Sequence, residues 1–157
     1  FFGSSNTHHL KKNVVQKDHI IKNEINTSYI NLKEILSKNQ GKNFFLKIDI
    51  EGNEYRILQD IVENQNYLEG LVIEFHNSDL MEEKILKFSE QLSLDLVHVH
   101  VNNFGDINNK GYATVFEATY SPRKYNIQRE QDEFIFPVKE LDQPNNEKAV
   151  DEKVSFE

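Results

Sequence analysis

Short apolar runs recur along the chain and alternate with segments in which the apolar residues are spaced differently. Residues 44–50 form a compact apolar run that Lys47 and Asp49 interrupt, and a run of this kind predicts a mostly buried strand. Residues 70–76 and 94–101 form two further runs of comparable length. We therefore predict three strands in this part of the chain.

Segments with helical spacing lie before and between these runs, at residues 31–39, 53–66 and 80–92. Asn31 followed by Glu34, and Asp79 followed by Glu82, have the spacing of helix caps and predict where the first and third helices begin. The alternation of strand and helix is typical of an α/β fold in which right-handed crossovers join parallel strands.

A fourth strand is predicted at residues 112–120, after a loop rich in glycine and asparagine at 102–111. A crossover between parallel strands needs about a dozen residues or more, which this loop does not provide. We therefore expect the fourth strand to run antiparallel to its neighbour.

The two ends of the chain have no comparable pattern. Residues 1–25 are polar apart from the pairs Val14-Val15 and Ile20-Ile21, which suit short strands or extended connections. Residues 121–157 are charged and rich in turn residues, and we expect an extended tail that wraps the domain or a partner-facing arm. The predicted organisation is an α/β portion over 1–120 followed by this tail.

Composition narrows the functional classes. The formal net charge is -8 and the isoelectric point is about 5.3, so binding of nucleic acid through general electrostatic attraction is not expected. The absence of cysteine excludes disulfides, thiolate zinc sites and a cysteine nucleophile. The sequence has no apolar run that approaches the ~20 residues needed to span a bilayer, so we expect a soluble protein of the cytoplasm.

Polar side chains gather where the predicted parallel strands end. In open α/β sheets, ligands bind outside the carboxyl ends of the strands. The polar or glycine residues at these positions are Asp49, Glu51, Gly52, Glu74, His76, His98, His100, Asn102 and Asn103. Because side chains alternate along a strand, residues two apart in this set share one side of their strand. We expect all three strands to bring acid, imidazole or amide groups to one edge of the sheet.

These groups allow several kinds of chemistry. Asp49 or Glu51, crowded by another carboxylate, is a candidate to take a proton from a hydroxyl, and His76 or His100 is a candidate base near neutral pH. Gly52 allows a tight turn into the next helix, whose N-terminus favours an anionic group. A divalent cation is also compatible with the set, with Asp49, Glu74, His76 and His100 as candidate ligands.

Most of these residues also have a purely structural interpretation, and Asn102 and Asn103 suit a plain turn. Asp49 and Glu51 suit the capping of the helix that follows them. His98 and His100 alternate with valines, which suits the solvent-facing side of a half-buried strand. Glu74 is different, because a carboxylate inside an apolar strand needs a partner if it is buried.

The stretch 46–54, Leu-Lys-Ile-Asp-Ile-Glu-Gly-Asn-Glu, resembles the K-I-D-x-E-G-x-E signature of the FkbM family of S-adenosylmethionine-dependent methyltransferases. Flanking stretches are similar to the family as well. Residues 31–36 resemble its "tLddll" element and residues 71–74 its "ivvE" strand. The Asn102-Asn103 loop, together with residues 115–119, resembles the end of one bacterial branch. The resemblance extends over residues 26–120.

The resemblance implies a fold, a cofactor and an activity. The fold is a partial class I methyltransferase sheet, a Rossmann-like arrangement of parallel strands with a terminal antiparallel strand, and the cofactor is S-adenosylmethionine. The implied reaction is O-methylation. A carboxylate or imidazole orients and deprotonates a hydroxyl of a sugar, lipid or small metabolite in line with the sulfonium methyl group.

The resemblance also places Asp49 and Glu51 beside the transferring methyl group. We accordingly predict catalytic roles for Asp49, Glu51 and His76, and cofactor contacts for Asp49 and Gly52. The residues predicted to bind the acceptor are Glu74, His100, Asn102 and Asn103.

The N-terminal part departs from the family pattern. Family members bind the cofactor through a glycine-rich loop and an acidic residue, and the stretch Phe2-Gly3-Ser4-Ser5, with its single glycine, provides no such loop. Too few residues precede 44–50 for three strands and their helices, so we expect the C-terminal half of such an enzyme. The alternative is a non-catalytic half-Rossmann module that binds a partner or forms homo-oligomers through an exposed sheet edge. A metal-dependent hydrolase that uses Asp49, Glu74 and the histidines is a third hypothesis.

Overall fold

The computed structural model describes residues 32–37, 43–125, 135–138 and 141–155 of the 157-residue chain. The predictions for residues 1–25, including Phe2-Gly3-Ser4-Ser5, and for the cap at Asn31 lie outside these ranges. The described part contains a four-stranded sheet and a two-stranded sheet.

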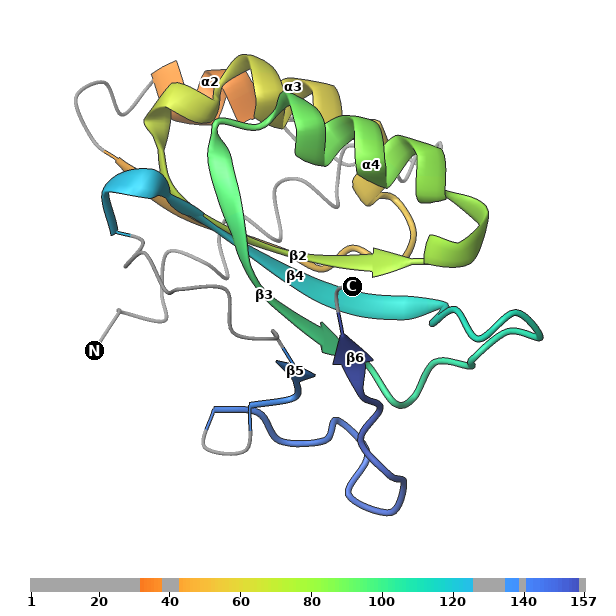
Figure 1. The fold of residues 1–157 in the computed structure, drawn as a ribbon. Coiled ribbons are helices and arrows are strands. Elements are labelled where there is room, and N and C mark those ends of the chain that lie inside the picture. The colour runs from red at the N-terminus through yellow and green to blue at the C-terminus, as the bar shows by residue number, and fades with distance from the viewer. Residues whose placement is uncertain (1–31, 38–42, 126–134, 139–140, 156–157) are drawn as a thin grey trace, which may run out of the picture.

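The four-stranded sheet is the centre of the fold (Figure 1). Its strands are β1 (Phe44–Ile48), β2 (Leu68–His76), β3 (Leu94–Val101) and β4 (Val115–Pro122). Each predicted apolar run forms a strand. β3 has the predicted bounds, whereas β1 ends at Ile48 rather than at residue 50 and β2 begins at Leu68 rather than at residue 70.

The sheet is mixed, with the strand order β1-β2-β4-β3. β1 and β2 are parallel, and β4 runs antiparallel to both β2 and β3, which confirms the direction predicted for the last strand. In this order β4 lies between β2 and β3. The short loop after β3 returns the chain directly alongside it, so Glu117 of β4 separates Glu74 of β2 from His100 of β3 in the register.

Among the described residues, three helices cover one face of this sheet (Figure 1): α2 (Leu32–Ser37), α3 (Leu58–Glu63) and α4 (Glu82–Gln91). Side-chain alternation in β2 explains why this face is the apolar one. Leu71, Ile73 and Phe75 are fully buried, and the residues that alternate with them, which include Glu74 and His76, face the opposite side. The helix-covered face therefore forms the core, and the other face carries the polar groups.

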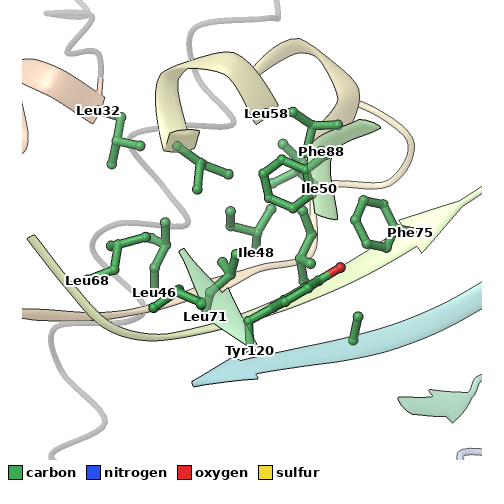
Figure 2. Packing of buried hydrophobic residues seen from close by; sticks show 14 residues of the cluster. Leu32, Leu46, Ile48, Ile50, Leu58, Leu68, Leu71, Phe75, Phe88 and Tyr120 are labelled. Atoms are coloured by element: carbon green, nitrogen blue, oxygen red, sulfur yellow. The ribbon is translucent and has the colours of Figure 1, made fainter. Parts of the chain in front are cut away.

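The core packs around Phe75, which is fully buried. Its ring centroid lies 5.9 Å from that of Tyr55, 6.3 Å from that of Phe88 and 5.4 Å from that of Phe116. Figure 2 shows the surrounding cluster, to which Leu32, Leu46, Ile48, Leu58 and Leu71 contribute. Burial of this apolar surface is the main source of stability and fixes β2 relative to the helices.

The helix predicted at 53–66 is interrupted. Glu54–Arg56 and Gln65–Tyr67 are 3₁₀ turns, and α3 lies between them. Asn64 ends α3, because its Nδ2 donates a hydrogen bond of 2.7 Å to a main-chain carbonyl oxygen one turn earlier. The first of these 3₁₀ turns carries the side chain of Glu54, which is fully buried.

The cap predicted from Asp79 and Glu82 is wrong. A 3₁₀ turn at Ser78–Leu80 precedes α4, whose N-cap is Met81 with no side-chain capping hydrogen bond. Asp79 instead accepts a hydrogen bond of 3.1 Å from Nδ2 of Asn108 in the loop before β4. The acidic side chain therefore joins two loops rather than starting a helix.

Two short strands, β5 (Ile135–Phe136) and β6 (Val154–Ser155), pair with each other and lie against β3, away from the helices (Figure 1). The ring of Phe136 packs edge-on against His98, with 4.8 Å between the ring centroids. The described part of the predicted tail therefore contacts the sheet. No helix among the described residues is both long enough and apolar enough to cross a membrane.

Candidate functional site

The loops that follow β1 and β2 meet at one edge of the sheet. Glu51 (φ 57°) and Gly52 (φ 92°) have left-handed backbone conformations after β1, and Asn77 (φ 51°) has one after β2. A Cβ on Gly52 would lie 3.7 Å from Nδ2 of Asn77, which shows how closely the loops approach. A left-handed residue other than glycine costs about 1–3 kcal/mol, so the packing of the two loops must hold Glu51 and Asn77 in place.

The structure brings four of the predicted site residues together at this edge: Asp49, Glu51, Glu74 and His76. Nε2 of His76 lies 3.4 Å from Oε2 of Glu51 and 3.8 Å from Oε2 of Glu74. Ligand atoms of Asp49, Glu74 and His76 lie within 4.8 Å of one another, a spacing that suits a bound hydroxyl or a divalent cation. Glu74 and His76 are largely buried, whereas 84% of the Glu51 side chain is exposed, so the cluster has a buried floor and an open side.

A further carboxylate, Glu54, supports this cluster from inside the protein. Its side chain is fully buried. Oε1 of Glu54 accepts a hydrogen bond of 2.6 Å from the main-chain N–H of His76 and lies 3.2 Å from Nδ1 of the same residue. Oε2 accepts a hydrogen bond of 3.0 Å from the N–H of Gly52. A buried carboxylate needs such partners, because burial without them costs several kcal/mol.

The sequence alone predicts no role for Glu54. An acidic residue at the start of a helix ordinarily faces solvent near the positive end of the helix dipole, and nothing in its spacing predicts burial. The signal that was available is its place as the last residue of the K-I-D-x-E-G-x-E stretch.

Glu74 is held in an environment that favours its protonated form. Burial raises the pKa of the Glu74 carboxyl above its ordinary value, and the hydrogen bond and negative charge of Asp49 raise it further. A hydrogen bond of 2.7 Å from Nδ2 of Asn102 to Oε1 of Glu74, and the charge of His76, lower it. The partner that the sequence requires for Glu74 is thus supplied by Asn102 and Asp49 together.

His98, His100 and Asn103 do not join this cluster, although all three were predicted at its edge. Nε2 of His98 lies 2.8 Å from Oδ1 of Asp142, and Nε2 of His100 lies 3.1 Å from Oδ1 of Asp151. Asn103 donates to a main-chain carbonyl oxygen of the same C-terminal segment. The expectation of one shared edge is wrong for these residues, because β4 separates β3 from β2 and the tail covers their side chains. They also do not face solvent freely.

The structural interpretation of Asp49 and Glu51 as helix caps does not describe the fold. Asn53 is the N-cap of the first 3₁₀ turn and makes no side-chain capping hydrogen bond. The N–H of Gly52 binds Glu54, so the anionic group expected at this helix start is the carboxylate of the protein itself. Asp49 and Glu51 therefore belong to the corner formed by the two loops rather than to a helix cap.

A separate pocket of about 630 Å³ lies on the helix-bearing side of the sheet. Its walls come from α4, β3, β4, the loop before β4 and residues 152–154 of the tail, and include Ile85, Leu86, Val99, Val101 and Phe116. Asp49, Glu51, Glu74 and His76 are not among the residues that line it. This mostly apolar pocket is therefore a different site from the cluster of Asp49, Glu51, Glu74 and His76, which we call the acid–histidine cluster.

Comparison with known families identifies the chain. A sequence model described as the methyltransferase FkbM domain matches residues 2–110, more than half of the 157 residues. The chain belongs to the FkbM methyltransferase family. The FkbM match begins closer to the N-terminus than the resemblance over 26–120, and it contains the loops after β1 and β2 that build the acid–histidine cluster. No curated protein and no solved structure matches the chain.

Proposed function

We propose that this FkbM-family chain carries the acceptor-side catalytic corner of an S-adenosylmethionine-dependent O-methyltransferase, and that most of the cofactor site comes from residues outside the described ranges. The observation that carries the proposal is the convergence of Asp49, Glu74 and His76 at the carboxyl ends of the parallel strands β1 and β2. Membership of a methyltransferase family supports the type of reaction.

O-methylation needs a group that accepts the hydroxyl proton while the acceptor oxygen attacks the methyl group. We assign this role to Nε2 of His76, which lies beside the carboxylate oxygens of Glu51 and Glu74. A proton received by Nε2 gives a positively charged imidazolium, and the negative charge of Glu51 stabilises it, as does that of Glu74 when this carboxyl is ionised. The bond that forms joins the acceptor oxygen to the methyl carbon, and the bond that breaks joins that carbon to sulfur.

Asp49 and Glu74 orient the acceptor in this scheme. Asn102 holds Oε1 of Glu74, and Oε2 of the same carboxyl faces His76. A hydroxyl that binds Asp49 or Glu74 therefore lies within reach of Nε2 of His76, since the three groups are within 4.8 Å of one another. Fixed geometry of this kind lowers the entropy cost of reaching the transition state. Sugars, lipids with free hydroxyls and small polyhydroxy metabolites are the acceptor classes that suit a corner lined with carboxylates.

The corner also suits the charge of the cofactor. S-adenosylmethionine supplies an electrophilic methyl group on a positively charged sulfonium. Carboxylates at Asp49 and Glu51 are compatible with that positive charge, and Gly52, which has no side chain, follows them in a left-handed turn. We propose Asp49 and Gly52 as the described residues that face the cofactor.

Calorimetry of cofactor binding and an assay of methyl transfer, both on the longest natural form of the protein, test the proposal. S-adenosylmethionine is expected to bind, and Asp49→Asn is expected to reduce methyl transfer by about 100-fold or more without lowering the melting temperature. Glu117→Gln is the matched control, because Glu117 lies on the same face of the sheet and pairs with Lys47 rather than with the cluster. A melting temperature that responds to Mn²⁺ and not to S-adenosylmethionine would favour a metal-dependent hydrolase built on Asp49, Glu74 and His76.

A second candidate function is a non-catalytic module that associates through its sheet edge. In the described sheet β1 is an edge strand, and Phe45 on it is 50% exposed. Such an edge can pair with another chain. Sedimentation of the chain and of Phe45→Lys separates the two candidates. A dimer that dissociates when Phe45 is replaced by Lys, and that forms unchanged when Asp49 is replaced by Asn, would favour the module.

A further inference from the structure

We propose that Glu54 is a positioning residue that sets both the orientation of the His76 ring and the nitrogen that carries its proton. The consequence for catalysis rests on the proposed function. The state of the imidazole does not, because it is a property of the chain alone. The two parts of the inference can therefore be tested separately.

The contacts of Glu54 leave its carboxylate little freedom. The side chain is fully buried, and Oε2 is held by the N–H of Gly52. Oε1 contacts His76 at two points, the main-chain N–H at 2.6 Å and Nδ1 of the ring at 3.2 Å. The carboxylate cannot turn away from the ring without breaking hydrogen bonds to two loops. The position of the ring is therefore fixed by the same group that joins the ends of β1 and β2.

The contact with Nδ1 also decides the tautomer of His76. An ionised carboxylate only accepts hydrogen bonds, so Nδ1 must carry the hydrogen that faces Glu54. In the neutral imidazole, Nε2 then holds a lone pair directed at the corner where Glu51 and Glu74 lie. The opposite tautomer would place a hydrogen on Nε2, which would donate to those carboxylates and could not accept the proton of a substrate. Glu54 therefore keeps His76 in the form that acts as a base.

Tyr55, the residue after Glu54, makes a further contact that fixes the position of His76. Tyr55 donates a hydrogen bond of 2.7 Å from its hydroxyl to the main-chain carbonyl oxygen of His76. Burial, together with the negative charges of Glu54 and Asp79, raises the pKa of Tyr55, so its hydroxyl stays a donor. Consecutive residues of one turn thus bind the N–H, the ring and the C=O of the same histidine.

Nitrogen-15 NMR of the histidine side chains of the chain tests the first part directly. The His76 signals, assigned by their loss in His76→Gln, are expected to show a protonated Nδ1 and an unprotonated Nε2 when the ring is neutral. Glu54→Gln and Glu54→Ala are expected to remove this preference, while the signals of His98 and His100 stay unchanged. Glu117→Gln is the control for loss of a carboxylate on the polar face of the sheet. A wild-type His76 with its hydrogen on Nε2 would overturn the inference even if neither Glu54 variant folds, and so would an unchanged tautomer in both variants.

Steady-state kinetics of methyl transfer by the longest natural form of the protein test the second part of the inference, that Glu54 supports the role of His76 as a base. Glu54→Gln is expected to lower kcat by about 100-fold while KM changes by less than about 3-fold, because the acceptor is still bound and the base is lost. A KM effect with unchanged kcat would overturn the positioning role. If the wild-type enzyme transfers no methyl group at all but the NMR result holds, the proposed function fails and the control of His76 by Glu54 stands.

Discussion

Nδ2 of Asn102 lies 2.7 Å from Oε1 of Glu74, and this contact joins the end of β3 to a strand with which β3 does not pair. β4 separates the two strands, so the asparagine reaches Glu74 from the loop beyond the end of β3. This loop therefore contributes to the acid–histidine cluster, whereas the histidines of β3 bind the tail.

Asn102→Ala is expected to raise the pKa of Glu74 further. The asparagine hydrogen bond is one of the two influences that lower this pKa, and its loss leaves burial and Asp49 opposed only by the charge of His76 among the causes identified. Carbon-13 NMR titration of the Glu74 carboxyl measures the change. Asn103→Ala is the matched control, since the neighbouring asparagine binds the C-terminal segment instead. An unchanged Glu74 titration in Asn102→Ala would show that the hydrogen bond does not act on this carboxyl.

Glu74→Gln is expected to change how stability depends on pH. The folded state holds the Glu74 proton more tightly than the unfolded chain, because burial raises the folded pKa. The stabilisation that this gives is fully present below the ordinary glutamate pKa and is lost as pH rises through the raised folded value. Urea denaturation in metal-free buffer across this window should therefore show a smaller loss of unfolding free energy with rising pH in Glu74→Gln.

The matched control for this pH experiment is Glu69→Gln. Hydrogen bonds from Tyr125 and Lys124 lower the pKa of Glu69, so its contribution to stability is present above the ordinary pKa and is lost as pH falls through the folded value. The two substitutions should thus remove slopes of opposite sign. The same slope in the wild type and in Glu74→Gln would contradict the raised pKa.

Phe75→Ala is expected to lower the unfolding free energy by about 3–5 kcal/mol, because it leaves a cavity where three aromatic rings meet the fully buried Phe75 ring. Chemical denaturation measures this loss. Leu86→Ala on α4 is the control, since the Leu86 side chain is 56% exposed, and its cost should be below about 1 kcal/mol. Equal losses in the two variants would mean that the core is not centred on Phe75.

The double substitution Asp142→Asn and Asp151→Asn is expected to loosen the C-terminal segment from β3. It removes the negative charges that face His98 and His100, at a cost of about 1–2 kcal/mol in total. Hydrogen exchange should become faster at residues 141–155 and stay unchanged in β2. Glu147→Gln, an exposed acid in the same segment, should leave exchange as it is in the wild type. Unchanged protection of 141–155 in the double variant would rule out the two histidine contacts as the attachment.

Much of the fold follows from local patterns in the sequence. The apolar runs at 44–50, 70–76 and 94–101 are strands, and the short loop after the third run forces the antiparallel return of β4. These features depend on side-chain alternation and on loop length, both of which can be read along the chain. The family was likewise evident from the 46–54 stretch, and the FkbM domain match confirms it.

The features that were missed depend on contacts between distant residues. Glu54 and His76 are 22 residues apart, and the contacts of His98 and His100 with the tail span 44 and 51 residues. No local pattern shows that an acid in a helical turn will be buried, or which strand will insert beside β2. The predicted cluster was therefore right for the loops after β1 and β2, where parallel pairing alone brings residues together, and wrong for the histidines of β3.

Transfer of a labelled methyl group from S-adenosylmethionine to hydroxyl acceptors by the longest natural form of the protein tests most directly whether His76 acts as the base in O-methylation. We expect label on acceptor oxygen in the wild type and in Glu117→Gln, and a loss of transfer of about 100-fold or more in His76→Gln. Label transfer that is equal in His76→Gln and the wild type would contradict this role, as would an absence of transfer to every sugar, lipid and polyhydroxy acceptor tested.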